Sequence, residues 1–156
     1  MEEFAKEYFE KAYMYQMDGK YKDAIEYFRK SIEFNPTAEA YTFLGWALSS
    51  TGDYRGAVDE CKRAIQLDPD FGNPYNDIGA YLIAMGNYDE ASVWLELALK
   101  SEKYLNREYA HYNLGVVYEK TGLWFEALAK YKNALEIRPD YKIAKKHYFK
   151  LIALLN

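Results

Sequence analysis

The chain has 156 residues, half of them hydrophobic, and carries a formal net charge of −4. This length suits either one ordinary domain or a short repeat array. The acidic balance, with a pI near 5.3, argues against nucleic acid as a partner, because such binders cluster Lys and Arg to displace counterions.

The number of cysteines and the length of the apolar segments indicate the compartment of the protein. The single Cys61 excludes an intramolecular disulfide and fits a reducing compartment. No apolar run reaches the ~20 residues that a membrane-spanning helix needs, and the N-terminal residues lack the apolar segment of a secretory signal. We therefore expect a cytoplasmic protein with no membrane partner.

One short phrase recurs four times along the chain. In each copy a Gly precedes an aromatic residue by two positions, and an Ala follows the aromatic by three. The glycines are separated by 33, 34 and 36 residues, and a period near 34 is typical of repeat architectures. Such a stack has no central cavity for an active site and offers a long curved surface instead. The copies are Gly19/Tyr21/Ala24, Gly52/Tyr54/Ala57, Gly86/Tyr88/Ala91 and Gly122/Trp124/Ala127.

The second copy predicts a pair of helices. Apolar residues recur at helical spacing from Ala40 to Leu48, and again from Tyr54 to Ile65. Between the two stretches, Gly52 suits the C-terminal cap of the first helix and Asp53 the N-cap of the second. Pro69 closes the second stretch, because proline disfavours helix at the residue before it. Each repeat is therefore expected to be two antiparallel helices joined by a short turn.

Two positions of the repeat hold only small residues, which predicts where the paired helices approach closely. Stacked neighbours would then share one continuous core. The position on the first helix holds Ala12, Gly45, Gly79 and Gly115, and that on the second holds Ala24, Ala57, Ala91 and Ala127.

These residues resemble the tetratricopeptide repeat. In the second copy the matching phrase is Tyr41-x-x-Leu44-Gly45-x-x-Leu48, followed by Gly52, Tyr54, Ala57, Ala64 and Pro69. The third copy lacks the closing proline and has a longer connector, with Lys103 in that place. The resemblance implies an all-α, right-handed superhelix of four helix-turn-helix repeats in a single domain. The repeats span about 5–37, 38–71, 72–107 and 108–141, and a capping helix covers 142–155.

The two ends of the array differ. Glu7, Lys11 and Met14 stand where inner repeats turn apolar residues toward the preceding repeat, so we expect no packing on that side. At the other end Ala144, Tyr148, Leu151 and Leu155 form an apolar face that should cover the fourth repeat. Phe149 falls at the position that otherwise holds Gly or Ala, with Ile152 nearby. It is either a tolerated surface aromatic or a contact with a second copy or a partner.

A search for catalytic residues finds none, and we expect neither an enzyme nor a bound cofactor. His111 and His147 have no His or Cys three or four positions on, so the pattern predicts no metal site. His111 fits a packed, hydrogen-bonded role. Cys61 occupies the position of Phe28, Leu95 and Tyr131 and should be a buried small hydrophobe.

The resemblance implies that the remaining residues of each first helix line a concave groove. Co-chaperones with this fold grip a C-terminal carboxylate with Lys, Asn and Arg, but this chain has Phe9, Tyr13, Phe43, Asn73 and Asp77 in those places, without a cation. Large rings beside small residues instead suit an extended peptide or an amphipathic helix. The residues predicted to line the groove are Phe9, Tyr13, Met17, Trp46, Asn73, Asn76, Ile83, Tyr109, Tyr112 and Val116.

The sequence thus predicts a non-catalytic protein-interaction module, an adaptor or scaffold that binds a peptide or helix of a protein partner in its aromatic groove. We expect a monomer. The alternative is a structural protein that self-associates, as a homodimer for example, through the groove or through Phe149 and Ile152.

Overall fold

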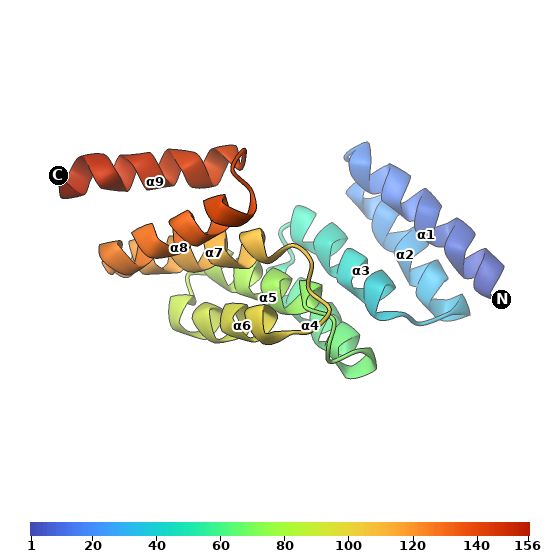
Figure 1. Cartoon of the computed structure of the whole chain (residues 1–156). Coiled ribbons are helices and arrows are strands. Elements are labelled where there is room, and N and C mark those ends of the chain that lie inside the picture. The colour runs from blue at the N-terminus through green and yellow to red at the C-terminus, as the bar shows by residue number, and fades with distance from the viewer.

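The computed structural model describes residues 1–156 and consists of nine α-helices (Figure 1). None of the nine has both the length and the apolar character needed to cross a membrane. In chain order the helices are α1 (Glu2–Met17), α2 (Tyr21–Phe34), α3 (Ala38–Ser50), α4 (Tyr54–Leu67), α5 (Asn73–Ala84), α6 (Tyr88–Lys100), α7 (Arg107–Lys120), α8 (Trp124–Ile137) and α9 (Lys142–Leu155).

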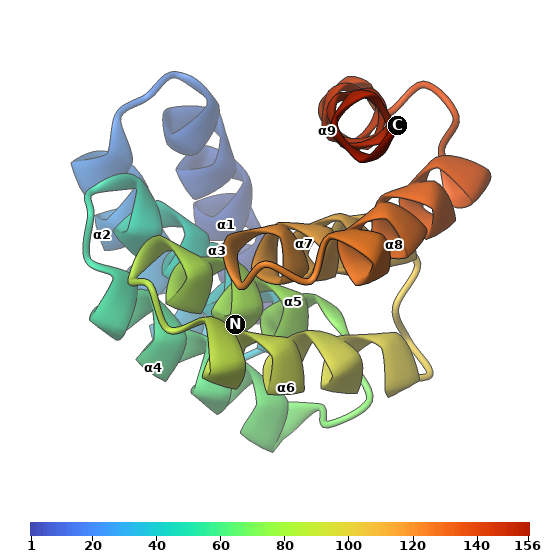
Figure 2. The ribbon, with the colours of Figure 1, turned by 90° about the vertical axis from the view of Figure 1, so that its left-hand side faces the viewer.

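The first eight helices form four consecutive hairpins that stack into a right-handed superhelix. In Figure 2, α1, α3, α5 and α7 lie on the inside of the curve, whereas α2, α4 and α6 lie on its outside. The inner helices touch one another as well as their hairpin partners. This arrangement confirms the predicted all-α superhelix and gives it one inner face.

The turns within the hairpins follow the sequence signals. Gly52 has φ 88°, a left-handed conformation that glycine adopts without strain, and the other three turn glycines share it. The Asp53 carboxylate accepts a hydrogen bond of 2.9 Å from the backbone N–H of Gly56 and caps α4. Both predicted caps of the second repeat are confirmed.

The small residues lie where the paired helices meet. A methyl group at Gly45 would stand 3.0 Å from both the Ala57 carbonyl oxygen and the Cys61 sulfur. At Gly79 it would come within 2.5 Å of the Leu95 side chain. Cys61 is fully buried, as predicted. Close packing of each hairpin therefore requires these small residues.

Helix α9 packs on α8 through the predicted face. Ala144 and Leu151 are buried, and Leu151 joins Ala127 and Tyr131 in a small core of its own. The main core runs through the first three hairpins and into α7. Phe149 is 55% exposed and contacts only its neighbour Tyr148 among the rings, at 5.4 Å between centroids.

Candidate functional site: an aromatic groove on the inner face

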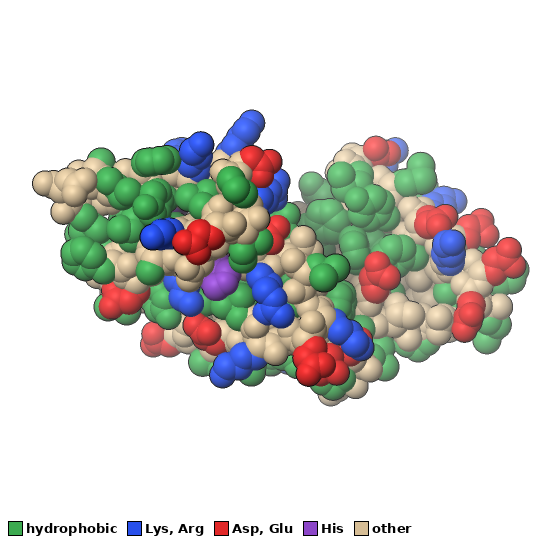
Figure 3. Space-filling view, viewed as in Figure 1, with side chains coloured by type: hydrophobic (Ala, Val, Ile, Leu, Met, Phe, Trp, Pro, Cys, Tyr) green, Lys and Arg blue, Asp and Glu red, His purple; other side chains and the backbone are tan.

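The inner face of the superhelix carries a groove of about 780 Å³. Figure 3 shows hydrophobic side chains beside the hollow between the α9 side and the α1 side of the molecule. The volume falls within the range of pockets that bind ligands. The groove is lined by Tyr13, Thr42, Phe43, Trp46, Asn73, Asn76, Asp77, Ala80, Tyr81, Tyr104, Asn106, Tyr109, Tyr112, Asn113 and Tyr141.

The N-terminal wall of the groove, which we define as Tyr13, Phe43 and Trp46, is a cluster of rings from α1 and α3. Phe43 lies at its centre, 5.8 Å from the ring centroids of both Tyr13 and Trp46 in edge-to-face geometry. Phe9 and Phe28 support Phe43 from the core at 5.1 and 5.9 Å. Tyr13 and Trp46 remain 42% and 38% exposed, so the wall presents ring surface to solvent.

The C-terminal wall, which we define as Tyr109, Tyr112 and Tyr141, comes from α7 and the residue before α9. The Tyr141 ring lies 5.7 Å from that of Tyr109 and 5.4 Å from that of Tyr112. The Arg138 guanidinium lies 5.2 Å over the Tyr141 ring. Burial raises the pKa of the Tyr112 and Tyr141 hydroxyls, so both stay protonated hydrogen-bond donors at neutral pH.

Behind the C-terminal wall, a polar network holds α9 in place. The Glu119 carboxylate accepts a hydrogen bond of 2.7 Å from the Tyr131 hydroxyl and lies 2.8 Å from His147 Nδ1. Lys150 Nζ lies 3.4 Å from its other oxygen. Desolvation opposes ionisation of Glu119, but the bonds from Tyr131 and His147 outweigh it and lower its pKa. The folded protein therefore favours the ionised form of Glu119, which bridges α7, α8 and α9 behind the wall.

The floor, which we define as the groove residues of α5 together with Tyr104, carries amides and one carboxylate. Asn113 Nδ2 donates to Asn76 Oδ1 at 3.0 Å, and Asn76 Nδ2 donates to Asp77 Oδ1 at 3.4 Å. Burial raises the pKa of Asp77 to about 7, and the weak bond from Asn76 offsets only part of this effect.

The long connector between α6 and α7 supplies Tyr104. Lys103 fixes the connector against the loop before α5, since its N–H donates to the Asp70 carbonyl at 3.0 Å and its carbonyl accepts from Gly72 at 3.2 Å. Tyr104 is buried against Gly72, where a methyl group would stand 2.2 Å from the Tyr104 Cβ. Because residue 72 is a glycine, the Tyr104 side chain can pack against its backbone and form part of the floor.

The structure brings six of the ten predicted groove residues together, and the other four lie elsewhere. Phe9 packs beneath Phe43, and Ile83 packs against the main core. Val116 packs against the small core below α9, and Met17 is exposed at the end of α1. The six in the groove are Tyr13, Trp46, Asn73, Asn76, Tyr109 and Tyr112.

The histidines do not form a catalytic pair. His111 is half-buried, as a packed role requires, but its buried Nδ1 has no hydrogen-bond partner. Burial, reinforced by Lys130, lowers its pKa and keeps the ring neutral. His147 belongs to the Glu119 network. No cluster of three or more His, Cys, Asp or Glu side chains has a geometry that could hold a metal ion.

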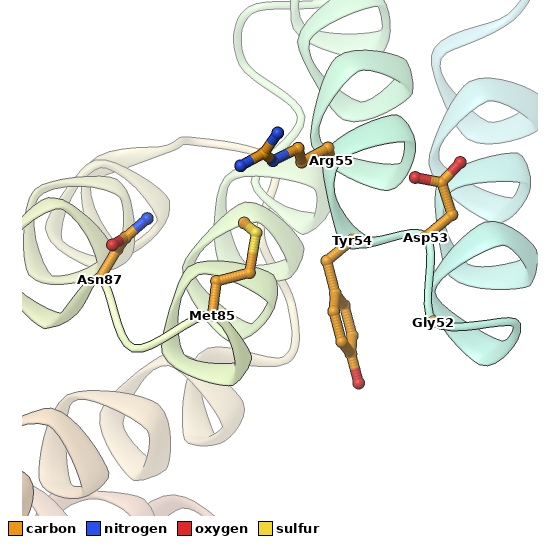
Figure 4. A pocket seen from close by; sticks show the side chains of 6 residues that line it. All are labelled: Gly52, Asp53, Tyr54, Arg55, Met85 and Asn87. Atoms are coloured by element: carbon orange, nitrogen blue, oxygen red, sulfur yellow. The ribbon is translucent and has the colours of Figure 1, made fainter.

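A second hollow lies between the turns on the edge of the stack. It is lined by Gly52, Asp53, Tyr54, Arg55, Met85 and Asn87. In Figure 4 the Tyr54 side chain points away from those of Asp53 and Arg55, and no set of polar groups converges. The inner groove, with its rings and amides, is the better candidate for a binding site.

Comparisons with known proteins identify the family of the chain. Models described as "Tetratricopeptide repeat" match residues 5–37, 48–111 and 108–141. The small glutamine-rich tetratricopeptide repeat-containing protein 2 of Mycosarcoma maydis is 39% identical over 72 residues, which are 46% of this chain and 20% of that protein. The chain spans only 12–22% of the length of the first curated relatives it matches.

Solved structures of repeat proteins have the same fold as this chain. The crystal structure of MamA superposes with a TM-score of 0.74 at 30% identity, over 90% of this chain and 81% of that one. YrrB, described as a TPR protein with an unusual peptide-binding site, superposes with a TM-score of 0.72 at 24% identity, over 91% of this chain and 73% of that one. The chain belongs to the tetratricopeptide repeat family of protein-interaction modules.

Proposed function

We propose that the inner groove binds a peptide segment of a protein partner, as an extended strand or an amphipathic helix. The observation that carries the proposal is the pair of aromatic walls on either side of a polar floor. Exposed Tyr and Trp rings act as anchors at protein interfaces, because they bury a large area at a small cost in side-chain entropy. YrrB provides a precedent for a peptide site on this fold.

The floor suits the polar part of such a ligand. Asn73 and Asn76 carry both donors and acceptors, which an extended backbone requires. Asn76 is bonded through its Oδ1 to Asn113, and its Nδ2 makes only the 3.4 Å bond to Asp77. Its amide is thus held in place with a donor weakly engaged, ready for a peptide carbonyl. The family and its relatives also point to a non-enzymatic role.

The test is a peptide-display selection on the immobilised protein, counter-screened with the double variant Tyr13→Ala/Trp46→Ala. We expect a convergent motif whose affinity falls at least about tenfold in the double variant, because truncation of an interface anchor costs more than 1 kcal/mol. A fold that is intact by circular dichroism, together with unchanged affinity, would refute the proposal.

The chain offers a matched control. Tyr21 and Trp124 are 37% and 48% exposed and lie at the turns, outside the groove. The variant Tyr21→Ala/Trp124→Ala removes the same two ring types at similar exposure. It should leave affinity for the selected peptides unchanged, which separates loss of the groove from a general loss of aromatic surface.

The second candidate function is self-association through α9. Exposure of Phe149 in contact with Tyr148 favours it, with Ile152 half-buried beside them. Light scattering over a concentration series tests it. A mass that rises with concentration in the wild type but not in Phe149→Ser would support it, and a monomer at every concentration would exclude it.

A further inference from the structure

We propose that the groove holds a lysine or arginine side chain of the bound peptide on the Asp77 carboxylate, between the aromatic walls. The inference rests on the proposed function and adds to it the chemistry of one anchor. It depends on the charges and aromatic rings that line the groove, and on the absence of a cation beside the Asp77 carboxylate.

Asp77 is a carboxylate without a counter-ion. The fifteen residues that line the groove include no Lys and no Arg. Asp77 is bonded only through the 3.4 Å contact with Asn76, and no cationic side chain of the chain acts on its ionisation. A half-buried carboxylate with one long hydrogen bond is unfavourable unless a cation compensates it. A partner's cation would supply that compensation.

The residues packed around Asp77 provide no such charge. Asp77 adds to burial in raising the pKa of Tyr81 on α5 and of Tyr104 on the connector, so both hydroxyls lie within its field. On α4, Cys61 is likewise buried within reach of the Asp77 charge. The Tyr104 hydroxyl is buried without a hydrogen-bond partner. All three of these neighbours stay neutral at pH 7, and a cationic side chain would satisfy the carboxylate.

The surrounding rings suit the same ligand. Cations within about 6 Å of an aromatic face are attracted to it. On the outer parts of the molecule the chain's own Lys side chains already take such positions, for example Lys11 at 4.6 Å from the Tyr27 ring. In the groove only Tyr141 has a cation over its ring, and Trp46, Tyr109 and Tyr112 have none. These three rings line the same groove as Asp77.

The sign of the site also excludes one class of ligand. Asp77 stands at a place where the clamp of co-chaperones has a group that attracts carboxylates, and the whole chain has a net charge of −4. An acidic C-terminal tail would meet repulsion here, because like charges across an interface cost several kcal/mol. Charge complementarity therefore favours a basic segment.

The experiment repeats the display selection, with a random dodecapeptide library, on three proteins. These are the wild type, Asp77→Asn, which keeps the shape and removes the charge, and Asp59→Asn, which removes a charge from the exposed outer surface of α4. We expect Lys or Arg to dominate one position of the motif on the wild type and on Asp59→Asn, and to lose that dominance on Asp77→Asn.

A double-mutant cycle then combines Asp77→Asn with a change in a selected peptide. Replacing its basic residue by Gln should weaken binding to the wild type at least about tenfold and binding to Asp77→Asn less than twofold. The loss of affinity of the Gln peptide is also measured on the wild type alone, so an unchanged affinity there overturns the proposal even where Asp77→Asn folds poorly.

The outcomes separate the two proposals. A motif that the Tyr13→Ala/Trp46→Ala variant abolishes, but that shows no basic position, overturns the assignment of Asp77 and leaves the peptide groove standing. A basic position that Asp77→Asn leaves unchanged does the same. A selection that enriches nothing overturns both.

Discussion

The two walls of the groove are built in different ways. In the N-terminal wall, the Phe43 ring packs on Phe28, and the rings of Tyr13 and Trp46 pack on Phe43. The C-terminal wall stands on Tyr131, whose hydroxyl joins Glu119 and His147 and thereby ties α7, α8 and α9 together. Phe28 and Tyr131 occupy equivalent positions in the first and fourth repeats. The repeat therefore provides the same support at both ends, but the last one adds a hydrogen-bonded attachment for α9.

The largest effects should come from removing the two supports. Phe28 and Tyr131 are both fully buried, and truncating a buried ring to Ala costs about 3–5 kcal/mol. Because repeats contact only their neighbours, each loss should remain local. Hydrogen exchange should show Tyr131→Ala exposing α8 and α9, and Phe28→Ala exposing α1 and α2.

The variant Tyr131→Phe sharpens this comparison. It keeps the ring and removes the hydroxyl's bond to Glu119 and its 3.3 Å contact with His147 Nδ1, and it makes the C-terminal support chemically equal to the N-terminal one. We expect a loss of about 1 kcal/mol that is confined to α9. Exchange that spreads evenly along the whole chain in either Ala variant would contradict the view of two separately supported walls.

An effect smaller than those of the two Ala variants concerns the floor between the walls. The folded state raises the pKa of Asp77 to about 7 from the ordinary 3.8, so the folded protein binds a proton more tightly than the unfolded chain. The contribution of Asp77 to the free energy of unfolding is therefore greatest below the ordinary pKa. It falls as the pH rises from about 4 to 7 and stays constant above the folded-state pKa.

Asp77→Asn removes this dependence. The variant should match the wild type near pH 4 and exceed it by about 1–3 kcal/mol at pH 8, as measured by chemical unfolding at both pH values. Asp59→Asn, on the outer surface, should change neither value. A variant that is less stable than the wild type at pH 8 would show that the carboxylate is satisfied in the free protein.

The sequence could predict what the repeat pattern controls. The small residues at Gly45, Gly79 and Gly115 recur at fixed spacing, so the pairing of the helices and the buried state of Cys61 follow from the pattern. The same spacing also placed Tyr13, Trp46 and Tyr109 on the inner helices.

The rest of the groove depends on features that do not repeat. Tyr104 lies on the irregular connector, which the sequence marks only by the missing proline, with Lys103 in its place, and by the longer spacing of 36 residues. Tyr141 lies in the turn before α9 and has no equivalent in the helical pattern. Phe9 and Ile83 share the spacing of groove residues, but both pack against the main core. Periodicity shows which helix is inside; it does not show how far each ring is rotated.

An effect confined to neutral pH tests the attachment of α9 through a single charge. Because the folded state lowers the pKa of Glu119, its contribution is present above the ordinary value of 4.5 and is lost as the pH falls through the lower folded pKa. Glu119→Gln keeps the shape but weakens the bonds from Tyr131 and His147. It should cost about 1 kcal/mol at pH 7 and nothing once the wild-type carboxylate is protonated. Unfolding measured at pH 7 and at a series of decreasing pH values below 4.5 checks this, and Glu136→Gln, an exposed change on α8, is the control. If α9 stays as protected from exchange in Glu119→Gln as in the wild type, apolar packing alone holds it, and the two walls differ only in the residues they present.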